Sequence, residues 1–214
     1  MKKSEPQAIG ALTPDRILIG TTNPGKVSEL RELFADLSVP VVGLYDVDDD
    51  LQDVEETGST FQENASLKAS EYARRYGLFT LADDSGLEVE ALDNRPGVFS
   101  ARYAGVETPF DEKIRLLLQE VQAANTPNRK ARFVCAMSVA DPLGRIAFSA
   151  EGICTGTLAF SPRGNGGFGY DPIFIPDGYY QTFGELDAAI KQQNSHRALA
   201  AAKIIRYLHG FFNV

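Results

Sequence analysis

Two adjacent carboxylates, Asp83 and Asp84, are the side chains in this sequence best suited to chemistry. They follow the apolar run 78–81, which predicts a buried strand, and Ser85 and Gly86 come directly after them. Adjacent like charges resist joint ionisation and an isolated buried charge is costly, so a divalent cation is one way to hold them. Mg²⁺ favours carboxylate oxygens and leaves room for substrate phosphates. The alternative is a polar turn between two strands, because Asp-Ser-Gly is ordinary turn chemistry.

A polar loop near the N-terminus has the composition of a phosphate-binding site. Residues 17–20 predict a short strand, residues 21–26 read Thr-Thr-Asn-Pro-Gly-Lys, and apolar residues over 27–37 repeat at helical spacing. This order brings backbone N–H groups, hydroxyls and Lys26 to a helix N-terminus, where the helix dipole favours anions. The glycine spacing is not that of a Walker A loop, and a plain connecting turn is the alternative.

Two further polar stretches lie in the last third of the chain. Residues 163–172 contain four glycines, interleaved with aromatic and acidic residues, and so many glycines are costly to order. The aromatic rings are suited to stacking on a base, although a wide hairpin loop with buried rings is the alternative. His196 and Arg197 fall in the first turn of a helix that Ser195 caps. Cations there oppose the helix dipole, so a bound anion would explain them.

An acidic stretch over residues 46–56 contains two carboxylates that stand apart from the rest. Most of the stretch is typical of a solvated loop. Glu55 and Glu56 are different because Thr57 and Gly58 turn the chain directly after them.

Three other polar residues each allow two interpretations. Asn64 and Lys68 lie one turn apart on a helix that a capping-box pattern predicts to begin near Thr60. They either face a cleft or occupy ordinary exposed positions. Arg102 stands alone between Ala and Tyr, and it either extends along the surface or clamps a phosphate.

Composition limits the classes of function. The chain has 214 residues, 43% of them hydrophobic and 23% charged, which predicts a sizeable core. A formal net charge of −8 argues against a broad basic surface for nucleic acid, but not against a single nucleotide. Cys135 and Cys154 lie in apolar runs and are interpreted as buried thiols in a reducing compartment. No apolar run is long enough for a membrane span and residues 1–7 lack a signal peptide, so we expect a cytoplasmic protein.

Strands alternate with helices in the first part of the chain, and hairpins follow. Besides the elements above, the patterns predict a helix opened by Thr108 and Pro109, a short helix over 182–190, and strands over 41–44, 87–91, 132–140, 146–158 and 173–175. This order predicts an α/β fold in which helices flank a mixed sheet and a cleft separates two lobes.

Five of these stretches, in this order and spacing, carry a family resemblance. They are residues 21–26, 55–58 with 63–65, 82–87, 166–172 and 195–197. Together they resemble the inosine triphosphate pyrophosphatase family, whose members act on non-standard purine nucleoside triphosphates. Each motif is weak alone, but the set is specific and spans nearly all of the chain after residue 15.

The resemblance implies an architecture and an activity. It implies an elongated mixed sheet, a nucleotide-binding cleft between two lobes, and a homodimer. The implied reaction is Mg²⁺-dependent hydrolysis of a nucleoside triphosphate to the monophosphate and pyrophosphate. Residues 1–15 lie outside the family pattern and are expected to form a flexible extension, while residues 16–214 form a single two-lobed domain.

The family pattern also implies a role for each motif. Asp84 would accept the proton of the attacking water and would bind the metal together with Glu55, or with its neighbour Glu56. The substrate would be held by Thr21, Thr22, Asn23, Pro24, Gly25, Lys26, Ser85, Phe168, Gly169, Tyr170, Asp171, Lys191, His196 and Arg197. Thr22 is a departure, because many relatives carry glycine at this position.

The residue types agree with the implied chemistry. Water must attack the α-phosphorus in line, while Mg²⁺ and Lys26 neutralise charge on the leaving pyrophosphate. A carboxylate near the metal can orient and deprotonate that water. A pocket that donates hydrogen bonds to a 6-oxo group would reject adenine, which predicts ITP, dITP and XTP as substrates, with guanine rejected at its 2-amino group. Two alternatives are a pyrophosphatase for modified pyrimidine triphosphates and a nucleotide-binding module that no longer hydrolyses.

Overall fold

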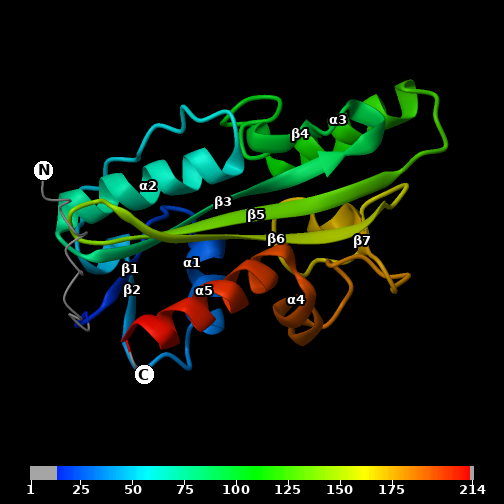
Figure 1. Cartoon of the computed structure of the whole chain (residues 1–214). Coiled ribbons are helices and arrows are strands. Elements are labelled where there is room, and N and C mark those ends of the chain that lie inside the picture. The colour runs from blue at the N-terminus through cyan, green and yellow to red at the C-terminus, as the bar shows by residue number, and fades with distance from the viewer. Residues whose placement is uncertain (1–13, 213–214) are drawn as a thin grey trace, which may run out of the picture.

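The computed structural model describes residues 14–212, and over these residues a single seven-stranded mixed sheet runs the length of the molecule (Figure 1). The strand order is β2-β1-β3-β5-β6-β7, and β4 pairs with the far part of β3. The strands are β1 (Ile17–Ile19), β2 (Val41–Gly43), β3 (Phe79–Val89), β4 (Arg95–Pro96), β5 (Lys130–Ala140), β6 (Ile146–Leu158) and β7 (Phe174–Pro176). The predicted α/β fold with an elongated mixed sheet is confirmed. Predictions for residues 1–13 lie outside the described residues.

The first half of the sheet is parallel. β1 pairs with β2 on one side and with β3 on the other. Parallel neighbours need crossover connections, which are supplied here by helices α1 (Pro24–Leu33) and α2 (Phe61–Tyr76). The predicted capping box is present, since Thr60 accepts a hydrogen bond from the backbone of Glu63 and the Glu63 carboxylate accepts one from the backbone of Thr60.

The alternative interpretation of Asp-Asp-Ser-Gly as a turn between two strands is wrong. Residues 79–89 form one continuous strand, β3, and its pairing with β5 is unbroken from Thr80 opposite Ala140 to Val89 opposite Ala131. A cross-strand partner that long fixes each residue in extended geometry and overrides the local preference of Asp-Ser-Gly for a turn. Gly86 has a different role there: a Cβ atom on it would lie 2.4 Å from the carbonyl oxygen of Gly97.

The second half of the sheet is antiparallel, as the hairpin pattern predicts. β5 pairs with both β3 and β6, and β6 pairs with β7. The predicted turn between β5 and β6 is closed by a hydrogen bond from the backbone N–H of Gly144 to the carbonyl of Asp141, 2.8 Å long. Cys135 and Cys154 are buried free thiols, as predicted.

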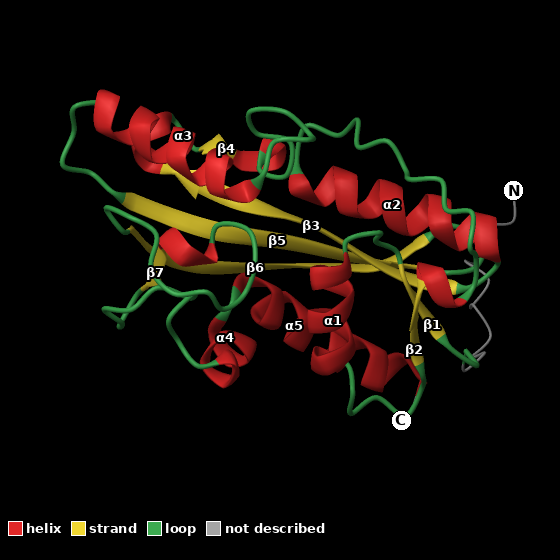
Figure 2. Cartoon of the chain, turned by 180° about the vertical axis from the view of Figure 1, so that it is seen from behind, coloured by secondary structure: helices red, strands yellow, loops and turns green. Residues whose placement is uncertain are grey.

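The remaining helices are α3 (Phe110–Ala123), α4 (Ala188–Asn194) and α5 (His196–Phe212). In Figures 1 and 2, α2 covers one side of the sheet, α1 and α5 cover the other, and α3 lies at the end far from β1 and β2. Two predicted helix starts need correction: Pro109 is the N-cap of α3 rather than its first residue, and α4 begins after Asp187. Residues 182–187 stay outside α4 because Thr182 is tied by hydrogen bonds to Glu185 and to the carbonyl of Arg163.

The core divides into two main clusters at opposite ends of the sheet. One joins β1, β3 and β5 to the inner face of α5, around Leu81, Met137 and Ile204. The other joins the far parts of β3, β5 and β6 to α3, around Leu117 and Phe174. Polar residues of β3 lie between the two clusters, and the candidate site is built on them.

Candidate functional site

The site forms where β3 loses its neighbour along one edge. Pairing with β1 stops at Leu81, opposite Ile19, and pairing with β4 begins at Glu88, opposite Pro96. Residues 82–86 therefore present an edge that no described strand covers. Successive side chains on a strand point to opposite faces of the sheet, so Asp83 and Asp84 serve different sides of this edge.

Asp83 points toward the side of the sheet that carries α1 and α5. Its side chain is fully buried, with Oδ2 3.1 Å from the ammonium of Lys26 and 3.2 Å from Nη2 of Arg197. Burial acts to raise the pKa of Asp83, but the positive charges of Lys26 and Arg197 outweigh it and hold the pKa well below its usual range. Asp83 is therefore a permanently ionised anchor for two cations.

Asp84 points toward α2, and its environment is different. Its Oδ2 accepts a hydrogen bond from the Asn64 amide at 3.0 Å, and its Oδ1 lies 3.6 Å from the ammonium of Lys68. The same ammonium is closer to Glu56, at 2.5 Å, so Asp84 receives the weaker share of its charge. Burial raises the pKa of Asp84, Lys68 lowers it and Glu56 raises it again, and the result lies above the ordinary value. A raised pKa suits a carboxylate that must accept a proton.

The structure separates the two candidate glutamates of the acidic loop. Glu56 is partly buried, and its carboxylate pairs with Lys68 and, at 2.8 Å, with Arg102. Glu55 is exposed. Burial acts to raise the pKa of Glu56, but Lys68 and Arg102 keep it below its usual range. Glu56 is therefore the acidic-loop carboxylate that lies beside Asp84, while the metal role expected of Glu55 or its neighbour Glu56 stays a prediction.

Residues 21–26, called the phosphate loop because the sequence predicts phosphate binding there, open α1 as expected. Asn23 is the N-cap, and its side chain accepts a hydrogen bond from the backbone N–H of Lys26 at 3.1 Å. Pro24 and Gly25 occupy the first turn of the helix. Thr21 is buried and accepts from the N–H of Asn23, so the loop delivers the N-terminus of α1 to the open edge of β3.

Thr22, the departure from the family pattern, points away from this cluster. Its hydroxyl donates to the carboxylate of Asp53 at 3.1 Å, and Asp53 also accepts from the phenol of Tyr72. The threonine thus connects the phosphate loop to the acidic loop.

The glycine-rich stretch and the last two helices enclose the other side of the site. The ammonium of Lys191 lies 4.7 Å from the centre of the Phe168 ring, and it pairs with the buried carboxylate of Asp171 at 2.6 Å. The ring also packs on the first turn of α1, because a Cβ atom on Gly25 would lie 3.2 Å from it. The phosphate loop and the glycine-rich stretch are thereby in contact.

His196 and Arg197 lie at the start of α5 and are buried. The imidazole of His196 stacks on Phe133 with ring centres 4.6 Å apart, and its Nδ1 has no partner among the described residues. Burial, reinforced by the charges of Arg197 and Lys191, lowers the pKa of His196 well below 6.5. The imidazole is therefore neutral near pH 7. Its buried Nδ1 lacks a hydrogen-bond partner, and a bound ligand could supply one.

A small cavity of about 70 Å³ lies among these groups. It is lined by Asn23, Lys26, Ser85, Gly86, Ser100, Ala101, Phe110, Phe133, Phe168, Gly169, Tyr170, Asp171, Lys191, His196 and Arg197. Pockets for small ligands usually have about 300–1,000 Å³. This cavity is therefore smaller than the usual range.

Comparisons with known proteins agree with this arrangement. The profile of the Ham1 family matches residues 17–207. This chain belongs to the Ham1 family. It is 49% identical to the dITP/XTP pyrophosphatase of Geobacillus kaustophilus, over 88% of this chain and 91% of that protein. It is 43% identical to the dITP/XTP pyrophosphatase of Oceanobacillus iheyensis, over 91% of this chain and 98% of that protein.

Solved structures of the Ham1 family share the fold. A HAM1 protein from Coxiella burnetii superposes with a TM-score of 0.83 at 39% identity, over 91% of this chain and 98% of that one. The Ham1 protein of Staphylococcus aureus superposes with a TM-score of 0.79 at 39% identity, over 91% of this chain and 98% of that one. The family resemblance deduced from the motifs is confirmed.

The donor set of this Ham1 site is compatible with Mg²⁺. Among residues 14–212 no three His, Cys, Asp or Glu side chains are grouped so that they could hold a metal ion. Mg²⁺, however, is commonly bound by one or two carboxylates together with substrate phosphates and water. Glu56 and Asp84 provide two carboxylates on one side of the β3 edge, and both now contact the ammonium of Lys68.

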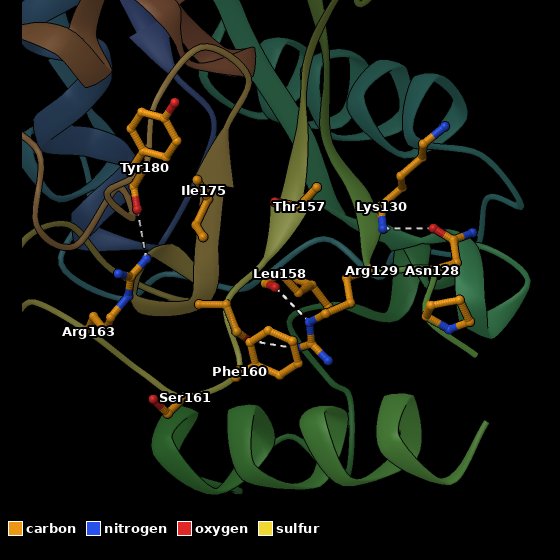
Figure 3. A pocket seen from close by; sticks show the side chains of 12 residues that line it. Asn128, Arg129, Lys130, Thr157, Leu158, Phe160, Ser161, Arg163, Ile175 and Tyr180 are labelled. Carbon is orange, nitrogen blue, oxygen red and sulfur yellow. Dashed lines mark hydrogen bonds between the residues drawn. The ribbon is translucent and has the colours of Figure 1, made fainter. Parts of the chain in front are cut away.

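The Ham1 chain has a larger cavity elsewhere, of about 790 Å³, beyond the ends of β5 and β6 (Figure 3). None of the predicted site residues lines it. Its Arg129 donates to the carbonyls of Leu158 and Ala159 and lies against the ring of Phe160. Its Arg163 donates to the carbonyl of Tyr180. These guanidinium groups support the backbone, so cavity size alone does not identify the functional site.

Four residues near the site lie outside the roles that the family pattern implies. Asn64 and Lys68 are buried beside Asp84, so the interpretation that they occupy ordinary exposed positions is wrong. Asp83 anchors cations, and Glu29 of α1 pairs with both Lys191 and Arg197. The helical spacing of Asn64 and Lys68 placed them on one face of α2 but did not say which way that face points, and the contacts of Glu29 depend on how α1 packs against α4 and α5. No helix within residues 14–212 has the length and apolar character needed to cross a bilayer.

Proposed function

We propose that this Ham1 protein hydrolyses non-standard purine nucleoside triphosphates, namely dITP, XTP and ITP, to the monophosphate and pyrophosphate. The observation that carries the proposal is Asp84, a buried carboxylate with a raised pKa beside Glu56 and the phosphate loop. The names of the relatives, dITP/XTP pyrophosphatases, agree with this activity.

In this proposal the triphosphate lies along the open edge of β3. The N-terminus of α1 and Lys26 bind phosphate oxygens, as helix N-termini and ammonium groups do. Asp84 and Glu56 would hold Mg²⁺, whose chemistry when bound is to neutralise charge on phosphate oxygens. Ser85 lies next to Asp84 on β3 and would touch the substrate.

Asp84 accepts the proton from the water that attacks the α-phosphorus. Its pKa lies above the ordinary value of 3.8, so it binds a proton more readily than a free aspartate while remaining available as a base. Asn64 fixes the orientation of the Asp84 carboxylate through the 3.0 Å hydrogen bond. The positive charge of Lys68 offsets the repulsion between the carboxylates of Asp84 and Glu56.

The purine base would lie in the cavity lined by Phe168, Tyr170, Asp171, Lys191, His196 and Arg197. A neutral His196 with a free ring nitrogen is suited to hydrogen bonding with a base rather than with a phosphate. Donors that match a 6-oxo group face another donor in adenine, and leaving buried polar groups mispaired costs far more than a lost apolar contact. Contacts at the 2-amino position are proposed to reject guanine.

The family resemblance also supports a homodimer, and we retain it as a proposal. Light scattering coupled to gel filtration tests it directly, because a dimer would have twice the mass of the 23.3 kDa chain.

The test of the proposed activity is pyrophosphate release from a panel of triphosphates, with and without Mg²⁺. We expect dITP, XTP and ITP to be hydrolysed with much higher kcat/KM than ATP or GTP, and only when Mg²⁺ is present. Comparable kcat/KM for ATP and ITP would remove the account of base selection. A preference for modified pyrimidine triphosphates would establish the alternative substrate class.

A further inference from the structure

Arg102 has no role in the family pattern, and the sequence alone leaves open whether it extends along the surface or clamps a phosphate. Its Nη1 lies 2.8 Å from Oε2 of Glu56, while the ammonium of Lys68 lies 2.5 Å from Oε1 of the same carboxylate. Both oxygens of Glu56 are therefore occupied by cations of the protein. Each oxygen keeps a further lone pair, but another positive ligand there would meet the repulsion of the cation already present.

The two cations are held very differently. The side chain of Lys68 is 7% exposed and sits between the carboxylates of Glu56 and Asp84. The side chain of Arg102 is 30% exposed, and Glu56 is its only carboxylate partner among the described residues. Lys68 is thus fixed by two anions inside the protein, whereas Arg102 can leave Glu56 without leaving the solvent-accessible edge of the site.

The backbone that carries Arg102 is anchored beside the cavity. The hydroxyl of Ser100 accepts from the N–H of Leu87 at 2.9 Å, and the carbonyl of Ser100 accepts from the phenol of Tyr170 at 3.0 Å. The ammonium of Lys113 donates to the carbonyl of Ala101. Ser100 and Ala101 line the cavity, so the arginine extends from a fixed segment next to the space where the substrate would lie.

The guanidinium group also retains unused donors. Among the described residues, only its Nη1 donates a side-chain hydrogen bond, although a guanidinium carries five N–H groups. The group lies 4.9 Å from the centre of the exposed Phe99 ring, a contact that does not consume N–H donors. A planar fork of free donors is well matched to the oxygens of a phosphate.

We propose that Arg102 is a substrate-binding residue for the pyrophosphate end of the triphosphate, and that it pairs with Glu56 until that ligand binds. When the phosphates enter, the guanidinium exchanges the Glu56 carboxylate for phosphate oxygens, and an oxygen of Glu56 becomes free. Both partners of the ion pair keep a counter-charge through this exchange. The inference rests on the proposed function, because it assumes that the triphosphate lies along the β3 edge.

The test is calorimetric binding of two product ligands, pyrophosphate and inosine monophosphate, in MgCl₂. The variants are Arg102→Met, which keeps the apolar stem, and Arg102→Lys, which keeps the charge without the fork. Arg95→Met is the matched control, because Arg95 also donates Nη1 to a glutamate, Glu120 at 3.1 Å, but neither residue lines the cavity. We expect Arg102→Met to weaken pyrophosphate binding at least tenfold, Arg102→Lys to weaken it less, and both to bind inosine monophosphate within twofold of the wild type.

Pyrophosphate affinity within twofold of the wild type in Arg102→Met would overturn the inference, as would undetectable pyrophosphate binding by the wild type. Equal losses for both ligands would show that the arginine only supports the fold, and would overturn it as well. The proposed function fails separately: a chain that hydrolyses no triphosphate yet binds pyrophosphate through Arg102 would refute the activity and leave this inference standing. Normal hydrolysis of dITP together with unchanged pyrophosphate binding in Arg102→Met would refute this inference and leave the proposed activity standing.

Discussion

Asp83 and Asp84 are neighbours on one strand, yet the fold gives them opposite properties. Asp83 lies on the α1 and α5 side, bound by Lys26 and Arg197, and its pKa is held far below the usual range. Asp84 lies on the α2 side, where burial and the nearby Glu56 raise its pKa although Lys68 is within 3.6 Å. One carboxylate is kept charged under all ordinary conditions, and the other is adjusted to take up a proton.

The comparison shows how a strand can assign two roles to identical side chains. Residues of a strand alternate between faces, so adjacent aspartates meet different helices and different charges. A pair of titratable groups whose environments push their pKa values apart is a signature of an acid–base site. The same division holds for the cations: Lys26 and Arg197 are organised by Asp83, and Lys68 is organised by Asp84 and Glu56.

The largest expected effect comes from removing the base. We expect Asp84→Asn to lower kcat for dITP by about 10³-fold, because a positioned general base contributes roughly 10²–10⁴-fold. Nucleotide affinity should be retained, since Lys26 and the residues proposed to bind the purine base are unchanged. Steady-state kinetics and calorimetric binding check both statements, and undiminished hydrolysis would mean that the base is another residue.

A smaller effect is expected at the acidic loop, where the structure distinguishes two adjacent glutamates. Glu56→Gln should lower the apparent Mg²⁺ affinity or the activity by about 10- to 100-fold, the loss typical of groups that support a metal site. Glu55→Gln is the matched control, because its side chain is exposed, and it should stay within about twofold. Mg²⁺ titrations of dITP hydrolysis measure both variants, and the reverse order would favour Glu55 as the metal ligand.

Replacing Asp83 should lower the free energy of unfolding rather than act on the chemical step. Asp83→Asn leaves Arg197 buried with one fewer anionic partner, and breaking a buried ion pair costs about 3–5 kcal/mol. Asp84→Asn should change the free energy of unfolding by much less, because Asp84 lies farther from the Lys68 ammonium than Glu56 does. Urea unfolding of the two variants checks this, and equal losses would mean that the two aspartates are not divided as described.

The smallest effect is a shift in pH dependence. A base must be unprotonated to act, so kcat/KM should fall as pH drops through the pKa of Asp84, which lies above 3.8. Lys68 lowers that pKa, so Lys68→Met should move the acidic limb of the profile to higher pH. The pH–rate profiles of the wild type and the variant measure the shift, and a limb that moved to lower pH would contradict the assignment.

Local signals in the sequence were sufficient for much of the fold. Alternation and helical spacing identified β1, α1, the β5–β6 hairpin and α5, and the Thr60 capping box fixed the start of α2. The continuous β3 was not predictable, because its extended geometry through Asp-Ser-Gly depends on pairing with β5, a distant segment.

The candidate site was predicted in its motifs but not in its contacts. Most of the residues named from the motifs line one cavity, with Lys26, Ser85, Asp171 and His196 among them, although Asp84 and Glu55 do not. Which glutamate faces Asp84, and where Asn64 and Lys68 point, depends on how the acidic loop packs on α2 and β3. No local pattern carries that information, since exposed and inward-facing polar residues of a helix have the same spacing.

The central claim is that water, positioned by Asp84, attacks the α-phosphorus of a non-standard purine triphosphate. Hydrolysis of dITP in ¹⁸O-labelled water, followed by mass spectrometry of the products, tests it most directly. The account predicts that the label enters the monophosphate and that the pyrophosphate is unlabelled. Label in the pyrophosphate, or release of labelled orthophosphate, would contradict it.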